Sequence, residues 1–356
     1  MTTLPRDGAV DVRAGEALDP EALGGFLGNA LGLRGEIAVQ QFPRGFSNLT
    51  YLVRIGADEL VLRRPPVGVR PGIAHDMARE YRVLHAVHGA GVPVPTPLAL
   101  CEDESVVGAP FYVMRRVHGV ILRMVTPEIA AALDATTCAR LSETFLDTLV
   151  AIHRVPLDVP GLRELGRPEG YVGRQVSGWV QRWQKARTDD VPAMDALAEW
   201  LTAEQPPTGT PALVHNDFKY DNLMLAPDDL TEIRAVLDWE MATVGDPLLD
   251  LGTSLGYWLE ADDPPQLKAL GLGISALPGN LRRAELWARY GAVTGREIPP
   301  MGWYHAFGLF KIAVIAQQIY ARWKAGLTTD PRFGALLGAV QLLAAQGRIA
   351  AGRPTR

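Results

Sequence analysis

Cysteine is scarce in this chain of 356 residues, where only Cys101 and Cys138 occur. Two cysteines so far apart exclude a disulfide framework and a cysteine-based zinc site, and they favour a reducing compartment over secretion. Long apolar runs are missing as well, because even the region 307–319 is interrupted by Lys311 and falls short of the ~18 residues that a membrane-spanning helix needs. We therefore expect a cytoplasmic protein with no membrane partner, in which both cysteines act as small apolar residues.

An excess of positive charge is also lacking, since 35 Lys and Arg residues face 40 Asp and Glu residues and leave a net charge of −5. Nonspecific binding of nucleic acid needs a concentrated cationic face, so we expect no nucleic-acid partner, although a local basic pocket stays open. The 47% hydrophobic content is typical of a globular protein with a large core. The length exceeds the roughly 100 to 200 residues of one domain and predicts two lobes or domains.

Short apolar and β-branched runs dominate the first third of the chain, with turn-forming residues between them. One segment there, 74–90, has apolar residues at three-to-four spacing and predicts an amphipathic helix. The predicted strands are 37–42, 50–55, 59–63, 96–101 and 110–117.

From residue 127 onward the pattern becomes helical, with one β-like island. The predicted helices lie near 128–153, 172–187, 192–203, 282–293, 302–325 and 334–351, and the island comprises 212–214, 223–225 and 234–237. A small β-rich lobe therefore precedes a large helical lobe.

The strongest chemical feature is the run His-Asn-Asp-Phe-Lys-Tyr-Asp-Asn at 215–222, followed by Asp238. Phosphoryl transfer from a nucleotide needs a carboxylate that orients the attacking hydroxyl and oxygen ligands that hold Mg²⁺ against the phosphates. Asp217 is the candidate for the first role, and Asn222 and Asp238 are the candidate magnesium ligands. Lys219 is placed to reach the transferring phosphate.

This order and spacing resemble the catalytic loop and metal-binding aspartate of the aminoglycoside phosphotransferase-like (choline kinase-type) branch of the protein-kinase-like superfamily. The resemblance implies an α+β, two-lobe fold with an antiparallel sheet and one helix in the N-terminal lobe and a mainly helical C-terminal lobe. It implies a division into 1–117 and 118–356, with a hinge near 115–119. It also implies ATP, with GTP open, and Mg²⁺ as cofactors.

Two upstream segments supply further parts in the order that the resemblance requires. Gly45, Ser47 and Asn48 lie between two predicted strands, where the family has its phosphate-covering loop; a plain hairpin turn is the alternative. Arg63 occupies the position of the usual phosphate-binding lysine, a departure that resembles the kinase-like domains fused to some acyl-CoA dehydrogenases. Glu80 on the following helix is then the expected carboxylate partner of Arg63.

The segment 111–119 resembles the hinge between the lobes. The resemblance implies that adenine meets backbone groups near Arg115 and Val117, with Met114 at the back of its pocket. A buried strand that ends in a turn is the alternative.

The segment 245–251, Gly-Asp-Pro-Leu-Leu-Asp-Leu, resembles the segment that follows the metal-binding aspartate in this family. We expect its carboxylates to brace the catalytic loop rather than touch substrate. Whether Asp250 begins a helix as its N-cap stays open.

Four histidines invite a metal or proton-transfer interpretation. We expect His215 to orient the catalytic loop by packing and hydrogen bonding, and His153 to be structural. His85 and His88 are three residues apart on the predicted helix, but no carboxylate or cysteine accompanies them at ligand spacing, so a solvated helix face is expected.

Aromatic and cationic side chains gather in the segments where this family builds its acceptor pocket. Tyr171, Trp179 and Trp183 are interleaved with Arg174, Arg182, Lys185 and Arg187, and a second aromatic group comprises Trp303, Tyr304, Phe307 and Phe310. Core packing is the first interpretation of both groups. A cationic and aromatic lining suits an acceptor with apolar and anionic parts, such as a hydroxyacyl-CoA, better than a polycationic aminoglycoside.

The resemblance predicts a small-molecule kinase that transfers the γ-phosphoryl group of ATP to a hydroxyl group. Two alternatives remain, an aminoglycoside phosphotransferase and a nucleotide-binding pseudokinase without turnover.

Overall fold

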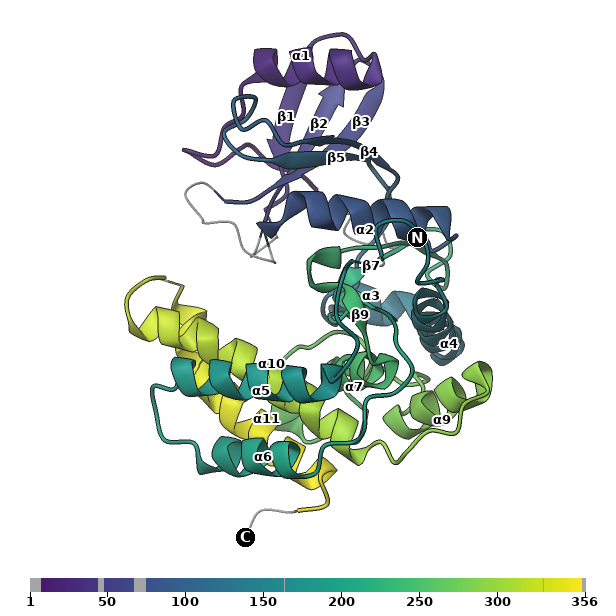
Figure 1. Cartoon of the computed structure of the whole chain (residues 1–356), viewed down its shortest axis with the longest axis vertical. Coiled ribbons are helices and arrows are strands. Elements are labelled where there is room, and N and C mark those ends of the chain that lie inside the picture. Colours follow the sequence, from purple (N-terminus) through teal and green to yellow (C-terminus); the bar gives the residue numbers. More distant parts are fainter. Residues whose placement is uncertain (1–7, 44–47, 67–74, 163, 329, 354–356) are drawn as a thin grey trace.

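The computed structural model describes the chain except residues 1–7, 44–47, 67–74, 163, 329 and 354–356. A sheet-containing lobe stands above a larger helical lobe (Figure 1). The predicted α+β two-lobe fold is therefore confirmed. Both cysteines are free and buried, which agrees with the expectation that they act as small apolar residues. The division at residue 117 stays a proposal; three residues later in the chain, Val120 already pairs with Leu225 of the helical lobe.

A five-stranded antiparallel sheet forms the first lobe, in the order β1-β2-β3-β5-β4. Its central strands are buried on both faces. In one of them Leu60 and Leu62 belong to one apolar core and Val61 to another, because successive side chains of a strand point to opposite faces. The strands are β1 Ile37–Gln41, β2 Leu49–Ile55, β3 Asp58–Arg64, β4 Pro97–Cys101 and β5 Phe111–Arg115.

Two helices accompany this sheet, one more than the sequence predicted. Helix α2, Met77–Gly89, corresponds to the predicted amphipathic helix and begins at the Asp76 N-cap. Helix α1, Pro20–Leu31, was not predicted, although an Asp19 N-cap and a Pro at its first position are helix-start signals. Its three glycines and only two buried leucines gave too weak a periodicity.

The helical lobe is arranged around α10, Gly302–Lys324, which packs against α5, α6, α7 and α11. Close approach of α7 and α10 depends on glycine, because a Cβ atom on Gly308 would lie 2.2 Å from the carbonyl oxygen of Gly252. The other helices are α3 Pro127–Ala132, α4 Ala135–His153, α5 Tyr171–Ala186, α6 Pro192–Ala203, α7 Pro247–Tyr257, α8 Pro265–Lys268, α9 Arg283–Thr294 and α11 Leu336–Ala350.

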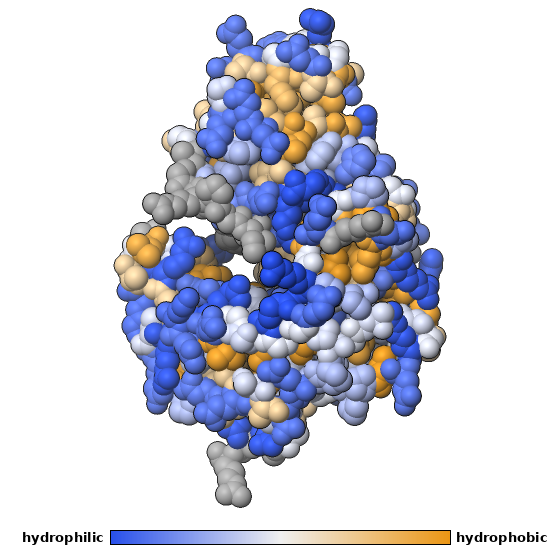
Figure 2. Space-filling model, in the orientation of Figure 1, coloured by the Kyte–Doolittle hydropathy of each residue, from blue (hydrophilic) through white to orange (hydrophobic). Residues whose placement is uncertain are grey.

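Two small antiparallel pairs form the predicted β-like island. Strand β6, Ala212–Val214, pairs with β9, Thr243–Gly245, and β7, Leu223–Leu225, pairs with β8, Ile233–Val236. The loop 215–222 connects β6 to β7, and the loop with Asp238 connects β8 to β9. Strand pairing thus brings both loops to the side where the lobes meet, and Figure 2 shows the surface hollowed there.

One helical segment, Pro331–Ala350, is long and apolar enough to cross a membrane by length and composition. Only 22% of it is buried, yet α11 within it packs Val340, Leu343 and Ala344 against α10 and α6. A single such segment is weak evidence for a membrane span, since core helices of the same composition are common.

Candidate active site

Three residues of the catalytic loop form one hydrogen-bonded group. Lys219 donates to both carboxylate oxygens of Asp217, at 3.1 and 2.8 Å. Asn222 Nδ2 donates to the backbone oxygen of Asp217 at 2.8 Å and to Asp217 Oδ2 at 3.0 Å. These contacts fix the Asp217 carboxylate and turn the Asn222 amide oxygen away from it.

Buried groups hold the backbone that leads into Asp217. Asn216 has a left-handed backbone, with φ of 66°, which costs energy in a non-glycine residue. Its N–H donates to Asp250 Oδ1 at 2.8 Å, its side-chain oxygen accepts from Tyr171 at 3.0 Å, and its side-chain amide donates to Met241 O. The strained conformation is therefore imposed by the surrounding helical lobe.

Asp238 follows β8 and is joined to the catalytic loop through its neighbour Leu237. The Leu237 N–H donates to Asn222 O at 2.8 Å, and His215 Nε2 lies 3.0 Å from Leu237 O. Asp238 itself has φ of 66°, so its backbone is strained like that of Asn216. The two candidate metal ligands, Asn222 and Asp238, are thus held side by side by backbone contacts.

Arg63 reaches this group from β3 and meets three carboxylates. Its Nη2 lies 2.6 Å from Asp238 Oδ1 and 3.2 Å from Glu240 Oε2, and its Nε lies 3.4 Å from Glu80 Oε2. The contact with Glu80 is an ion pair without hydrogen-bond alignment. The structure therefore brings together Arg63, Glu80 and Asp238, from both lobes.

The charges around Arg63 shift the pKa values of its partners in opposite directions. Burial disfavours an ionised Asp238, but the Arg63 guanidinium outweighs burial and the pKa of Asp238 is lowered. Burial dominates at Glu80 and raises its pKa despite Arg63. Asp238 is the group that stays ionised and able to accept a cation.

Lys219 and His215 also differ in charge state. Burial disfavours the Lys219 ammonium, but Tyr257 and Asp217 outweigh it and raise its pKa. Burial lowers the pKa of His215, whose Nδ1 accepts from the Asp217 N–H at 3.3 Å. His215 is therefore a neutral orienting residue, in agreement with its predicted role.

The predicted phosphate-covering loop lies partly outside the described residues, since Gly45 and Ser47 are not described. Asn48 is described and buried, and its Nδ2 donates to Glu240 Oε2 at 2.9 Å. Glu240 thus links this loop to Arg63. The sequence analysis gave Glu240 no role, although its position two residues after Asp238 was visible.

The structure narrows the choice of hinge backbone groups, and adenine binding there stays a prediction. Arg115 donates its N–H to Thr96 O at 2.9 Å within the sheet, so this amide cannot bind adenine. Val117, beyond the end of β5, makes no backbone hydrogen bond to any described residue and keeps both groups available. Met114 is buried opposite Val61 of β3, and its place behind adenine stays a prediction.

A small apolar cluster beside Val117 was not predicted. Ile121, Met224 and Ala235 are buried there, with Val117 and Leu237 packed against them. Gly119 permits this packing, because a Cβ atom at that position would lie 2.4 Å from Leu225 O. Met224 of this cluster lies two residues after Asn222 in the chain.

The segment 245–251 braces the loop, as predicted, and resolves one open point. Asp250 Oδ2 accepts from the His215 N–H at 2.7 Å and lies 3.1 Å from His153 Nε2. The N-cap of α7 is Asp246, whose side chain accepts from the Leu248 N–H, so Asp250 is not the cap. Asp250 is fully buried, which agrees with a role in positioning the loop 215–222.

The histidines outside the loop have the predicted environments. His153 is buried between Asp250 and Tyr290, and His85 and His88 lie on the exposed face of α2. Among the described residues, no three His, Cys, Asp or Glu side chains cluster to hold a metal by themselves.

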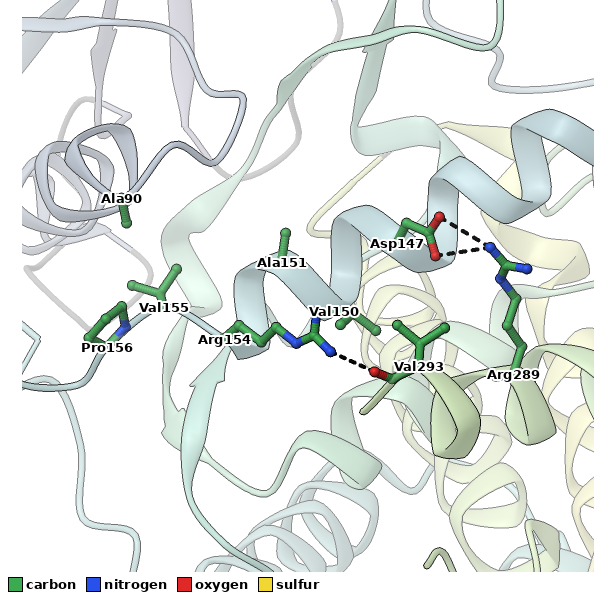
Figure 3. Close-up of a pocket in the computed structure, with 9 residues that line it drawn as sticks. All are labelled: Ala90, Asp147, Val150, Ala151, Arg154, Val155, Pro156, Arg289 and Val293. Carbon is green, nitrogen blue, oxygen red and sulfur yellow. Dashed lines mark hydrogen bonds and ion pairs between the residues drawn. The ribbon is translucent and has the colours of Figure 1, made fainter. Parts of the chain in front are cut away.

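Another hollow lies between α4 and α9, away from the loop residues (Figure 3). Its arginines are already engaged, Arg154 with Val293 O at 2.6 Å and Arg289 with Asp147 at 3.2 Å. None of its lining residues belongs to the predicted site.

The aromatic segment on α5 is buried on one face and cationic on the other. Trp179 and Trp183 are buried, in agreement with core packing, whereas Arg174, Arg182 and Lys185 are exposed. The Arg182 guanidinium lies 4.7 Å from the centre of the Trp179 ring. The second aromatic group is buried in α10, where Trp303 stacks on Phe307.

The donor set of the site fits magnesium. Mg²⁺ prefers oxygen ligands and is held in nucleotide enzymes by one or two carboxylates together with substrate phosphates. Asp238 supplies an ionised carboxylate, and the Asn222 amide oxygen accepts no hydrogen bond from a described residue.

Comparison with known proteins agrees with this geometry. The family model of the phosphotransferase enzyme family, APH, matches residues 38–287. Acyl-CoA dehydrogenase family member 11 of Gallus gallus is 38% identical over 303 residues, which are 82% of this chain and 38% of that protein. The chain spans between 29% and 43% of the length of the curated relatives it matches.

Solved structures have the same fold. A candidate aminoglycoside phosphotransferase from Ralstonia eutropha JMP134 is 31% identical, with a TM-score of 0.81 over 96% of this chain and 100% of that chain. A ternary complex of a thermostable variant of aminoglycoside phosphotransferase APH(4)-Ia with ADP and hygromycin B is 18% identical, with a TM-score of 0.59 over 92% of this chain and 98% of that chain, and shows the fold alone. The chain belongs to the APH phosphotransferase enzyme family, in the group that resembles acyl-CoA dehydrogenase family members 10 and 11.

Proposed function

We propose that this protein is a kinase that transfers the γ-phosphoryl group of ATP, or of GTP, to a hydroxyl group of a small molecule. One observation carries the proposal: Arg63 of the sheet lobe binds Asp238, whose neighbour Leu237 is bonded to the loop that holds Asp217. A phosphate-binding cation, a metal-binding carboxylate and a catalytic carboxylate are thus joined in one network.

The residues divide the reaction between them. Asp217 orients the acceptor hydroxyl and takes its proton as the oxygen attacks the γ-phosphorus and the bond to the β-phosphate oxygen breaks. Lys219, held against Asp217, offers positive charge to the transferring group. Arg63 faces the nucleotide phosphates, backed by Glu80, and Asn48 contacts them from the loop.

Asn222 and Asp238 would hold magnesium. When bound, the ion neutralises negative charge on the phosphates. The backbone groups of Val117 would receive adenine, with Met114 behind it and the apolar cluster beneath.

The acceptor class is the finer part of the proposal. The exposed cations on α5 and the similarity to acyl-CoA dehydrogenase family members favour an acceptor with apolar and anionic parts, such as a hydroxyacyl-CoA. Aminoglycoside phosphotransferase APH(4)-Ia shares the fold at under 20% identity and carries no argument about the acceptor. We further propose a cytoplasmic location without membrane or nucleic-acid partners.

The deciding experiment is thermal unfolding with and without MgATP and MgGTP. A nucleotide at about 100 times its dissociation constant stabilises the native state by roughly 2.7 kcal/mol. We expect a magnesium-dependent shift in the natural protein, its loss in Asp238→Ala, and its retention in Asp228→Ala, where an exposed carboxylate is removed. Absence of a shift with both nucleotides rejects the proposal.

An acceptor screen then separates the alternatives. Efficient phosphorylation of aminoglycosides without phosphorylation of hydroxyacyl-CoA compounds rejects the acceptor proposed. A nucleotide shift without turnover on any hydroxyl compound, water included, indicates a pseudokinase.

A further inference from the structure

Lys311 is a buried lysine in the middle of α10, with only 3% of its surface exposed. In the sequence, Lys311 stands out only as a break in an apolar run. Lysine is almost never fully buried without a partner, because removing an ammonium from water is costly. Among the described residues, no carboxylate lies within ion-pair distance of its Nζ.

The contacts of this ammonium point to the catalytic loop. Lys311 Nζ donates to the carbonyl oxygen of Asn216 at 2.5 Å and lies 5.4 Å from the centre of the Trp179 ring on α5. The bonded carbonyl belongs to the peptide unit that joins Asn216 to Asp217. The nitrogen of that same unit donates to His215 Nδ1.

Both ends of this peptide unit are therefore held, its oxygen by Lys311 and its N–H by His215. The orientation of the unit fixes the backbone direction into Asp217 and hence where the carboxylate starts. Asn216 is in a strained left-handed conformation, which persists only where surrounding contacts impose it. Its other polar groups are held from α5, α7 and the loop after β8.

We infer that Lys311 is a positioning residue for phosphoryl transfer, whose charged ammonium fixes the Asn216–Asp217 peptide and thereby aims the Asp217 carboxylate at the acceptor hydroxyl. This inference rests on the proposed function. Lys311 acts through the backbone and does not touch the nucleotide.

The charge of Lys311 is sensitive to pH. Burial lowers its pKa to about 8, opposed by the carboxylates of Asp217 and Asp250, while Lys219 and Arg182 add to the lowering. These are the charged groups that face Lys311 from the catalytic loop, α7 and α5. Lys219 does not titrate in the same range, because its own pKa is raised.

The test compares the natural protein with Lys311→Met, Lys311→Arg and the control Lys324→Met, a lysine on the same helix that is exposed and paired with Asp189. The readouts are MgATP hydrolysis with water as acceptor, from pH 6 to 10, and the melting shift caused by MgATP. We expect Lys311→Met to lose about tenfold or more in turnover at pH 7 and to keep the nucleotide shift, since misplacement of a catalytic group acts on the chemical step.

The pH profile separates positioning by charge from simple packing. We expect turnover of the natural protein and of Lys324→Met to fall above about pH 8, and Lys311→Arg to remove that fall, since arginine stays protonated. A flat alkaline profile in the natural protein overturns the inference even where a Lys311 variant does not fold. So does a Lys311→Met variant with turnover within twofold of the natural protein.

Failure of the proposed function gives a different result. A natural protein with neither a nucleotide shift nor turnover overturns the proposed function and this inference together. A natural protein that turns over, with a rate and pH profile indifferent to Lys311, overturns this inference alone.

Discussion

Two cations, the partly exposed Arg63 and the buried Lys311, reach the candidate site from different lobes, and their charges are neutralised in different ways. Arg63 enters from the sheet lobe and meets the carboxylates of Glu80, Asp238 and Glu240 within 3.4 Å. Lys311 enters from the helical lobe and meets a carbonyl oxygen and an indole ring. The side proposed for the nucleotide is therefore a compensated ion-pair network, whereas the side proposed for the acceptor holds an uncompensated charge.

This difference teaches what each cation can do. A guanidinium among carboxylates keeps its charge at every physiological pH and holds the two lobes together. An ammonium that contacts only a carbonyl oxygen and an aromatic ring is destabilised by burial, so its pKa is lowered and it loses its proton more easily. Constant charge suits phosphate binding, and a responsive charge suits control of the reacting carboxylate.

The largest effect is expected at Asp217, which follows the carbonyl group that Lys311 binds. In Asp217→Asn the hydroxyl loses its proton acceptor, so transfer should fall by about 10²- to 10⁴-fold while nucleotide binding persists. Turnover and the MgATP melting shift, measured on the same preparation, check this. Retention of turnover within tenfold would show that Asp217 is not the base.

The next largest effect is expected from removal of Arg63, the cation of the ion-pair network. Arg63→Met leaves buried carboxylates without their cation, and we expect a loss of about 3 kcal/mol in the free energy of unfolding and the loss of the nucleotide shift. Arg63→Lys should restore part of both, because a lysine reaches Asp238 with one charge. Chemical denaturation measures the stability.

The control for Arg63→Met is Arg54→Met. Arg54 lies on β2, is exposed and forms an ion pair with Glu59 of β3. Exposed pairs of this kind contribute only about 0 to 1 kcal/mol. If the two substitutions lower the free energy of unfolding equally, Arg63 contributes no more to stability than an exposed ion pair.

The buried charge of Lys311 can be tested through the pH dependence of the free energy of unfolding. Below pH 8 the folded and unfolded states both carry the Lys311 proton, so the burial penalty is fully present. Between about 8 and the ordinary value of 10.5, the folded state has lost the proton and the unfolded state keeps it. Stability therefore rises with pH, because the unfolded state binds more protons.

We expect the natural protein to gain up to roughly 3 kcal/mol relative to Lys311→Met between pH 7 and pH 10. Unfolding free energies of both proteins at the two pH values test this, since the contributions of other groups cancel in the difference. A constant difference would mean that Lys311 keeps an ordinary pKa.

The smallest effect is expected at Tyr171, which supports the same strained residue as Lys311. Tyr171→Phe leaves the buried Asn216 side-chain oxygen without its donor and should cost about 1 kcal/mol of stability. Turnover should fall less than in Lys311→Met, because the Asn216 carbonyl keeps its partner. An equal fall in turnover would assign the positioning to the whole pocket rather than to Lys311; steady-state kinetics decide.

Local sequence was enough for the strands, most helices and the catalytic loop, because their signals lie within a few residues. The run 215–222 carries its residue types at fixed spacing, and strand pairing then closes it with Asp238. Points that the sequence left open were decided by neighbours in space. The Arg115 amide is consumed by Thr96 of the adjoining strand, and the helix cap is Asp246 because Asp250 turns inward to the loop.

The sequence by itself determined the family, the two lobes and the residues of the loops, since these follow from composition, periodicity and motif order. Only the tertiary structure decided which groups hold those loops in place. Lys311 and Asn216 are 95 residues apart, and Arg63 and Asp238 are 175 apart. Contacts over such separations depend on how helices and strands pack, which no local pattern encodes.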